Sequence, residues 1–531
     1  MPSESKRMDT HVNRGLAWIG VASSLVGVLD LLAILIILNT WISAEEYGIA
    51  TKCVWIFPIL DQATDLGLSA AVIQRDDHSE SKISTVFWIN TGIALFLFAV
   101  IAVFAPILAV GFYGHAVIGS MLLVYGTKLI FQNFYFIPVA MMKRELRFKE
   151  LSIIRIIANL AEFAGKIGFA WAGFGVWCFV LGPLARVLVT GIGAQIRHPW
   201  RPKLMFHFKE AKEYVTFGLK TSGSQILYYF YTNVDYPIVG FFFGDTALGL
   251  YRMAYDLVLD PVRIISNVIV DIAFPAFARL RHATDRLIAQ FVSFTRLNLI
   301  TVMSFSAIVV VAADDVINVL FPKFRTHWEH FAFEVGGRTF EVYEEVTGAE
   351  WAVRILGIVA VLRAVGYVVP PLLDGVGKPE RTFTYTLTAA IAMPLAYVSG
   401  AVLLGPTMNF ESVAVSWVIG YPIAFAVLVW MATYTLGWSV AQYLRQIGGV
   451  ASCMLGAAAV AALVHLVLGD FPAWLRLAIT AGTVVLTSGL LLAYTQGISL
   501  RSAKRALSAP PDEKDPPVVD DPAPPTDQAA T

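Results

Sequence analysis

Charged side chains recur inside long apolar segments of this 531-residue chain. An ionised group near the centre of a bilayer costs at least ~2.5–3.5 kcal/mol, so such residues must pair with one another or face a hydrated interior. Cations placed there can bind anionic groups, and carboxylates can couple transport to a proton or another cation. The candidate substrate-binding cations are Lys52, Lys128, Lys220, Arg263 and Arg363, and the candidate coupling carboxylates are Asp30, Asp61, Asp65, Asp235, Asp256 and Asp260.

Two stripes of polar residues have the spacing of a helix face, with steps of three or four residues. The first, in the segment 213–242, contains Lys220, Ser224, Tyr228, Tyr231 and Asp235, and the second, in 248–272, contains Asp256, Asp260, Arg263, Asn267 and Asp271. Structural ion pairs between helices would explain any single pair, and most readily Glu162 with Lys166. For the two stripes together a shared cavity is the better interpretation. Tyr228 and Tyr231 join the binding candidates, because aromatic faces and hydroxyls suit sugar rings.

The elements that position these residues are predicted to be membrane-spanning helices. The chain is 57% hydrophobic and 15% charged, whereas soluble domains carry roughly 25% charged residues. A span needs about 20 mainly apolar residues, and fourteen stretches qualify, although twelve or thirteen spans remain open. They are about 15–39, 48–73, 84–110, 116–141, 152–172, 174–196, 213–242, 248–272, 288–313, 352–373, 381–404, 411–435, 446–468 and 473–496. An all-α polytopic membrane protein is therefore expected.

The basic residues predict the orientation. With the N-terminus inside and alternating spans, the cytoplasmic segments hold 26 Lys and Arg residues and the outer segments hold six. This asymmetry indicates that both termini are cytoplasmic, in the inner membrane of a bacterium. The Pro- and Asp-rich segment 501–531 is predicted to be a disordered tail. No GxxxxGK[ST], HExxH, CxxC or GxSxG motif occurs, so we expect no enzyme activity, cofactor, metal or nucleic-acid partner.

One segment is predicted to be a β-hairpin. Apolar and polar residues alternate from Phe331 to Glu344 on both sides of Gly336-Gly337, which is typical of two strands joined by a tight turn. The predicted orientation places the insertion 323–350 on the outer face, where it must lie in water or against protein because a strand pair cannot face lipid. It could shield the exit of the cavity, dock an outer-face partner protein such as a polymerase, or have no role.

Several strings of the sequence resemble the polysaccharide transporter family of the multidrug/oligosaccharidyl-lipid/polysaccharide flippase superfamily, in particular the Wzx-type colanic-acid and succinoglycan exporters. They are EYGIA at 46–50, DLGLSAAVIQR at 65–75, STVFWINTGIALFLF at 84–98, PVAMMKRELRFKELSIIRI at 138–156, FKEAKEYVTFG at 208–218, NVDYPIVGFFFGDTALGLYRMAYDL at 233–257 and AFPAFARLR at 273–281. The resemblance implies two six-helix lobes, 1–200 and 201–440, around a central cavity. Segment 441–500 would add two further spans.

The resemblance also implies a function by alternating access. The substrate would be an oligosaccharide on undecaprenyl diphosphate, a membrane lipid, turned from the cytoplasmic to the outer leaflet. Asp65 and Asp235 lie in family strings, which implies a structural or coupling role. A cation-coupled multidrug exporter is the alternative, but it would have an apolar cavity with little positive charge. A scaffold or receptor without transport activity is a third possibility, which the polar stripes disfavour.

Overall fold

The computed structural model describes residues 4–74, 79–335, 338–346 and 348–497. The predicted tail 501–531 and the turn residues Gly336 and Gly337 lie outside the described residues. A first helical group comprises α1 (Glu4–Thr40), α2 (Ala44–Val54), α3 (Phe57–Asp65), α4 (Leu68–Gln74), α5 (Glu80–Ile107), α6 (Ala116–Arg144), α7 (Phe148–Trp171) and α8 (Cys178–Arg197), with the short turns η1 (Leu108–Phe112) and η2 (Gly175–Trp177).

A second helical group follows in the chain. It comprises α9 (Phe208–Asn233), α10 (Asp235–Phe242), α11 (Gly244–Arg279), α12 (Thr284–Val311), α13 (Ala313–Leu320), the turn η3 (Pro322–Phe324), α14 (Glu350–Gly375), α15 (Pro379–Leu403), α16 (Gly405–Met408) and α17 (Glu411–Thr435). Two further long helices, α18 (Val440–Val467) and α19 (Ala473–Gln496), pack on each other and on α12. The described chain is thus almost entirely helical.

Among the described residues, ten helices are long and apolar enough to cross a membrane. They are α1, α5, α6, α8, α12, α14, α15, α17, α18 and α19. The bent unit formed by α2, α3 and α4 makes an eleventh if it counts as one span. The other three predicted spans correspond to α7, α9 and α11, which are long helices that carry more charge.

The predicted span 48–73 is broken rather than continuous. Leu66 and Gly67 have φ values of 41° and 68°, a left-handed conformation that a helix cannot contain. The axis bends by 42° between Asp65 and Leu68 as a result. The predicted span 213–242 is also divided, because α9 ends at Asn233 and α10 starts at Asp235.

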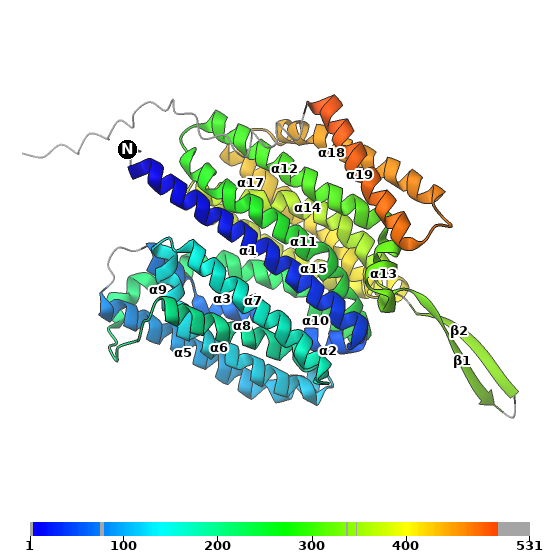
Figure 1. Cartoon of the computed structure of the whole chain (residues 1–531), viewed down its shortest axis with the longest axis horizontal. Helices are drawn as coiled ribbons and strands as arrows, with labels where there is room; N and C mark the ends of the chain where they lie inside the picture. Colours follow the sequence, from blue (N-terminus) through cyan, green and yellow to red (C-terminus); the bar gives the residue numbers. More distant parts are fainter. Residues whose placement is uncertain (1–3, 75–78, 336–337, 347, 498–531) are drawn as a thin grey trace, which may run out of the picture.

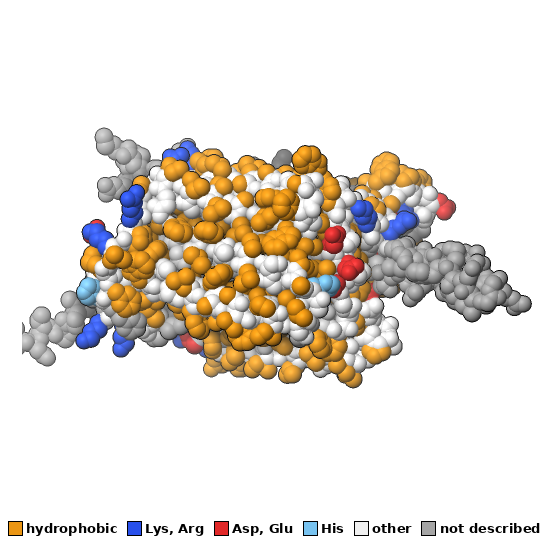
Figure 2. All heavy atoms as spheres, turned by 90° about the horizontal axis from the view of Figure 1, so that it is seen from below, with side chains coloured by type: hydrophobic (Ala, Val, Ile, Leu, Met, Phe, Trp, Pro, Cys, Tyr) orange, Lys and Arg blue, Asp and Glu red, His pale blue; other side chains and the backbone are white. Residues whose placement is uncertain are grey.

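The two groups lie side by side along their length (Figure 1). In the first, α7 packs against α8 and α1, and α6 packs against α5 and α8. In the second, α14 packs against α11, α12 and α17, and α15 against α17. Several contacts join the groups: α1 and α2 both pack against α11, α2 also packs against α10, and α9 packs against α3, α4 and α5 as well as α15. Figure 2 shows apolar side chains along the bundle and charged side chains gathered at its two ends, as expected for helices that cross a bilayer.

Glycine brings the backbones of α2 and α11 together. A Cβ atom on Gly48 would overlap the carbonyl oxygen of Asp245, and a Cβ on Gly249 would overlap that of Ala44. Any larger residue at either position would have to push the helices apart. Such small-residue contacts are the usual way in which membrane helices approach closely. The contact between the groups at this point is therefore one of backbone against backbone.

A two-stranded antiparallel sheet lies between α13 and α14. Its strands are β1 (His327–Val335) and β2 (Arg338–Val346), paired with Phe331 opposite Val342 and Phe333 opposite Phe340. The hairpin projects from the end of the bundle opposite to the N-terminus of α1 (Figure 1).

The base of the hairpin is held by hydrogen bonds. The backbone nitrogen and hydroxyl of Thr326 donate to the carboxylate of Glu350 at 2.8 and 2.9 Å, and the backbone nitrogen of Gly348 donates to the same hydroxyl at 2.9 Å. Glu350 is the first residue of α14. The strands thus start from a fixed point at the end of a long helix.

Candidate functional site

The first helical group brings several predicted charges together in one network. Glu162 on α7 contacts Lys166 at 2.7 Å, one turn away, and Arg186 on α8 at 3.0 Å. Lys166 also lies 3.8 Å from Asp30 on α1. The predicted i, i+4 pair therefore exists, but Glu162 serves two cations at once. Arg186 shares this carboxylate with Lys166 and is 38% exposed, so its guanidinium has N–H donors left to bind an anion.

A second ion pair lies nearby, between α3 and α6. The Lys128 ammonium is 2.5 Å from Asp61, and Gln132 donates to the same carboxylate at 3.1 Å. Lys128 also lies 5.2 Å above the ring of Tyr125. It is within electrostatic range of Arg186, so this pair and the Glu162 network belong to one region.

The second helical group faces this region with charges of its own. Asp260 and Arg263 on α11 form an i, i+3 ion pair at 3.1 Å and are 31% and 45% exposed. Asp260 is within electrostatic range of Asp30, and Tyr229 on α9 is within range of both Arg263 and Asp61. We refer to the set that spans both groups as the central charge cluster. It consists of Asp30, Asp61, Lys128, Glu162, Lys166, Arg186, Asp260 and Arg263.

Arg363 on α14 has a different environment. It is only 4% exposed, and it donates hydrogen bonds to the hydroxyls of Tyr255 at 2.8 Å and Tyr367 at 3.1 Å. Its guanidinium lies 5.0 Å from the centre of the Trp417 ring. Within the described part of the chain it forms no ion pair with a carboxylate. Arg263 is within electrostatic range of the same two tyrosines, so this aromatic cage adjoins the central charge cluster.

The two predicted tyrosines belong to an aromatic group beside Arg363. The Tyr231 hydroxyl is 3.1 Å from that of Tyr385, which is 3.4 Å from that of Tyr421. Tyr228 packs edge-on against Tyr231 at 5.6 Å. Tyr231 is buried, whereas Tyr228 is half-buried. Both lie within electrostatic range of Arg363.

Asp235 has a purely neutral set of partners. It is fully buried and accepts hydrogen bonds from Tyr251 at 2.7 Å, from Trp417 at 3.2 Å and from the backbone nitrogen of Tyr236 at 3.0 Å. Trp417 thus contacts both Asp235 and Arg363. The arrangement holds the start of α10 against α11 and α17.

Two other predicted residues lie at the contact between α2 and α11. Lys52 forms an ion pair with Asp245 at 2.5 Å, and His115 contacts the other oxygen of that carboxylate at 2.7 Å. Asp256 pairs with Arg252 at 2.8 Å. It also accepts a hydrogen bond from the Tyr47 hydroxyl. Lys52 and Asp256 are therefore engaged at this contact.

Asp65 and Lys220 complete the predicted set. The carboxylate of Asp65 accepts hydrogen bonds from the backbone nitrogen and hydroxyl of Ser69 at 3.0 and 2.6 Å. It thereby satisfies a free N–H group at the start of α4. Lys220 is part of α9, but its side chain lies outside the described residues.

Sequence reasoning did not include several residues in the site. Arg252 and Tyr367 were detectable, because each lies four residues from its partner, Asp256 and Arg363, on the same helix. Arg186 stood out only as one of the basic residues within the predicted spans, and neither it nor Tyr255 has a local signal that identifies its partner. Their partners come from other parts of the chain, so no spacing rule reveals them.

The fold is that of a class of membrane transporters. It matches the solved structure of the lipid II flippase MurJ in an inward closed conformation with a TM-score of 0.69 at 12% identity, covering 89% of this chain and 97% of that one. An inward-facing multidrug resistance MATE family transporter of the MOP superfamily matches with a TM-score of 0.57 at 14% identity, covering 79% of this chain and 98% of that one.

The sequence defines the family within this class. The family described as "Polysaccharide biosynthesis protein" matches residues 37–329, more than half of the chain, and the chain belongs to this family. The resemblance to polysaccharide transporters is confirmed.

Curated relatives agree. The chain is 25% identical over 304 residues to the teichuronic acid biosynthesis protein TuaB of Bacillus subtilis, covering 56% of this chain and 61% of TuaB. It is 22% identical over 450 residues to the lipopolysaccharide biosynthesis protein WzxC of Escherichia coli, covering 81% and 82%. The succinoglycan biosynthesis transport protein ExoT of Rhizobium meliloti is 21% identical over 373 residues, covering 69% and 70%.

Proposed function

We propose that this protein is a flippase. It moves undecaprenyl-diphosphate-linked oligosaccharide units across the bacterial inner membrane for the synthesis of an exopolysaccharide, capsule or O-antigen. The observation that carries the proposal is the central charge cluster, in which partly exposed arginines from both helical groups, Arg186 and Arg263, are linked through the carboxylates of Asp30 and Asp260. A diphosphate needs such cationic partners, and guanidinium groups bind it in a bidentate manner.

The mechanism that fits this arrangement is alternating access between two lobes. We take residues 1–200 and 201–440 as the lobes and 441–500 as two added spans. The cluster would line a cavity that opens to one side of the membrane at a time. The α2–α11 contact, with Gly48 and Gly249 at its centre, would part when the cavity opens at that end. The helix α9, which packs against both groups, would carry the movement between them.

The proposed topology has fourteen spans with both termini in the cytoplasm. The ten apolar helices, the bent unit α2–α4 and the charged helices α7, α9 and α11 together give this number. The excess of Lys and Arg in the segments at the α1 N-terminal end supports the orientation. The charges on α7, α9 and α11 are compatible with spans that face the cluster rather than lipid.

A cation-coupled multidrug exporter is the alternative function, since MATE transporters share the fold. Such a protein would carry an apolar cavity with few carboxylates. The four cations of the cluster, among them the partly exposed Arg186 and Arg263, favour an anionic substrate instead. Carboxylates such as Asp30, Asp61 and Asp260 could still couple transport to a cation gradient.

The test is complementation of a strain that lacks its own flippase but keeps the matching glycosyltransferases. We expect the chain to restore surface polymer and to lower the pool of lipid-linked units on the cytoplasmic leaflet. Matched assays of drug resistance in the same strain check the alternative. Restored drug resistance without restored polymer would overturn the proposal.

We further propose that the hairpin docks an outer-face protein of polysaccharide assembly, such as a polymerase. A deletion of residues 327–347 leaves the hydrogen bonds among Thr326, Gly348 and Glu350 in place. We expect lipid-linked units to reach the outer leaflet at the normal rate while the polymer chain length changes. The measurements are a leaflet-specific assay of lipid-linked units and gel analysis of polymer length. A normal polymer length, or a loss of flipping itself, would contradict the docking role.

A further inference from the structure

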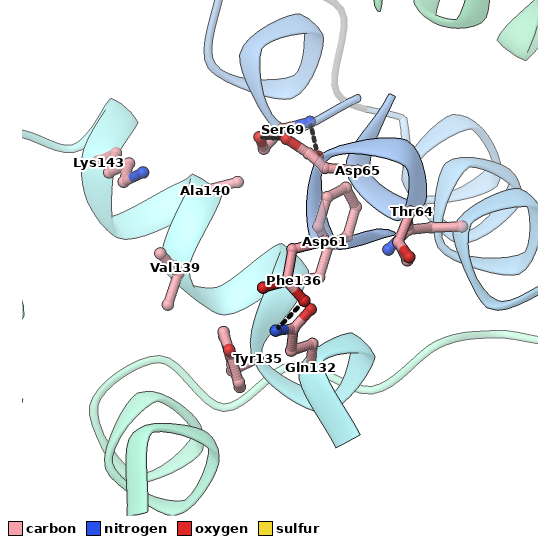
Figure 3. A pocket seen from close by; sticks show the side chains of 11 residues that line it. Asp61, Thr64, Asp65, Ser69, Gln132, Tyr135, Phe136, Val139, Ala140 and Lys143 are labelled. Carbon is pink, nitrogen blue, oxygen red and sulfur yellow. Dashed lines mark hydrogen bonds between the residues drawn. The ribbon is translucent and has the colours of Figure 1, made fainter. Parts of the chain in front are cut away.

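A pocket that shares Asp61 with the central charge cluster lies inside the first helical group, between α3, α4, α5 and α6 (Figure 3). Its volume is about 230 Å³. One water occupies about 30 Å³ in the liquid, so the pocket has room for a group much larger than a single ion. Lys143, in the last turn of α6, and Gln132, three turns earlier, both line it. The pocket therefore extends inward from the end of the bundle at which α1 begins.

One residue of the pocket, Asn90, has a side-chain oxygen without a hydrogen-bond partner among the described residues. Its side chain is 3% exposed and lines the pocket. Its amide nitrogen donates to Asn133 at 2.6 Å, and Asn133 in turn donates to the carbonyl of Leu129 at 3.0 Å, which fixes the orientation of both amides. The Asn90 Oδ1 atom accepts no hydrogen bond from any described residue. A buried acceptor is normally satisfied, and a donor on a bound group reaches this oxygen after a small rotation of the side chain, because the atom itself is enclosed.

The rest of the lining is also rich in acceptors. Asp61 and Asp65 point toward the pocket from α3 (Figure 3). Each already accepts hydrogen bonds from protein donors, yet each carboxylate oxygen has a further lone pair to offer. Tyr135 adds a hydroxyl. A ligand with several hydroxyl donors on a compact ring matches this lining.

A bare cation matches it less well. The charge of Asp61 is already neutralised by Lys128 at 2.5 Å, and the ammonium of Lys143 lines the same pocket. Two cations beside two carboxylates leave little net attraction for another positive charge. The combination of amide, carboxylate and tyrosine groups suits a neutral polyol or a sugar that carries one acidic group.

We propose that this pocket is a monosaccharide-binding subsite, which holds one sugar ring of the substrate before it is moved. That this sugar belongs to a lipid-linked oligosaccharide rests on the proposed function. The two carboxylates accept hydrogen bonds from the ring hydroxyls, and Asn90 Oδ1 does so once its side chain has rotated toward the pocket. The ammonium of Lys143 pairs with an acidic substituent when the sugar ring carries one.

The proposal is tested by the binding of free monosaccharides to the purified full-length chain in detergent. Saturation-transfer NMR is recorded with hexoses, 6-deoxyhexoses, N-acetylhexosamines and hexuronic acids. Two variants address the pocket: Asn90→Ala removes the unsatisfied acceptor, and Val139→Phe fills the space. Val103→Phe, at a 63% exposed position of α5, is the matched control. Thermal melting of each variant checks that it is folded, and melting in sodium chloride against choline chloride checks for a cation site.

We expect at least one monosaccharide to bind the wild-type chain and Val103→Phe, and its affinity to fall at least about tenfold in either pocket variant that remains folded. Three results would overturn the subsite. They are that no sugar binds, that all variants bind equally, or that sodium stabilises the chain and only the pocket variants lose this stabilisation. Polymer export is measured separately. Restored export without sugar binding would reject the subsite alone, whereas pocket-dependent sugar binding without export would support it and reject the proposed function.

Discussion

Replacement of Arg263 by alanine is expected to reduce polymer export about 10- to 100-fold at equal membrane abundance, since a hydrogen bond to a charged group contributes about 1.5–3 kcal/mol. Arg263 is 45% exposed and has only Asp260 as an ion-pair partner in the described part of the chain. Its guanidinium can therefore turn toward a diphosphate. Arg263→Lys keeps the charge, so we expect it to retain most of the activity.

The matched control for Arg263 is Arg354→Ala on α14. Arg354 pairs with Asp314 at 2.5 Å, and Asp314 is 50% exposed. Exposed ion pairs of this kind contribute only about 0–1 kcal/mol, so export should stay near normal. Export is measured as polymer per cell with immunoblots of the membrane fraction. If Arg263→Ala and Arg263→Lys export the same amount of polymer, Arg263 does not bind an anion.

The second large effect is expected for the stability of the α2–α11 contact. Arg252→Ala leaves the Asp256 carboxylate, which is 2% exposed, without its cation. Removing one partner of a buried ion pair destabilises by about 3–5 kcal/mol, whereas replacing both partners by apolar residues is often neutral. We therefore expect a clear loss of thermal stability for Arg252→Ala and a recovery in the double variant Arg252→Met, Asp256→Leu.

The measurement is the melting temperature of each variant in detergent, with export as a second readout. The double variant is the control, because it tests the unpaired charge rather than the loss of a side chain. A double variant that melts as low as Arg252→Ala would contradict the explanation by an uncompensated carboxylate. Export tests separately whether this contact has a role in transport. A contact that must open and close can fail to support transport even when the thermal stability is restored.

Periodicity in the sequence predicted the local part of the site. The pair Asp260 and Arg263 lies on one helix face, as expected, and the hydrophobic pattern indicated the class of fold. The stripe from Lys220 to Asp235 is interrupted, because α9 ends at Asn233 and Asp235 starts α10. Asp235 is consequently buried between Tyr251 on the next helix, α11, and Trp417 on the distant helix α17.

Contacts between helices were not predictable from spacing. Lys128 and Asp61 lie 67 residues apart in the chain, and the cage of Arg363 is formed mainly by residues from other helices. One sequence without an alignment contains no signal for such pairs. The break at Leu66 and Gly67 was missed for a related reason: an apolar stretch with one glycine is typical of a continuous span, and only the backbone dihedrals show the turn.

The hydrogen-bonded base of the hairpin has a practical consequence for protein engineering. The chain leaves the bundle at Thr326 and returns at Gly348, which are joined by a hydrogen bond of 2.9 Å. Any compact module whose own ends lie close together could replace the strands without moving α13 or α14. An epitope tag or a small fluorescent domain grafted there would report, in intact cells, which side of the membrane this end of the bundle faces.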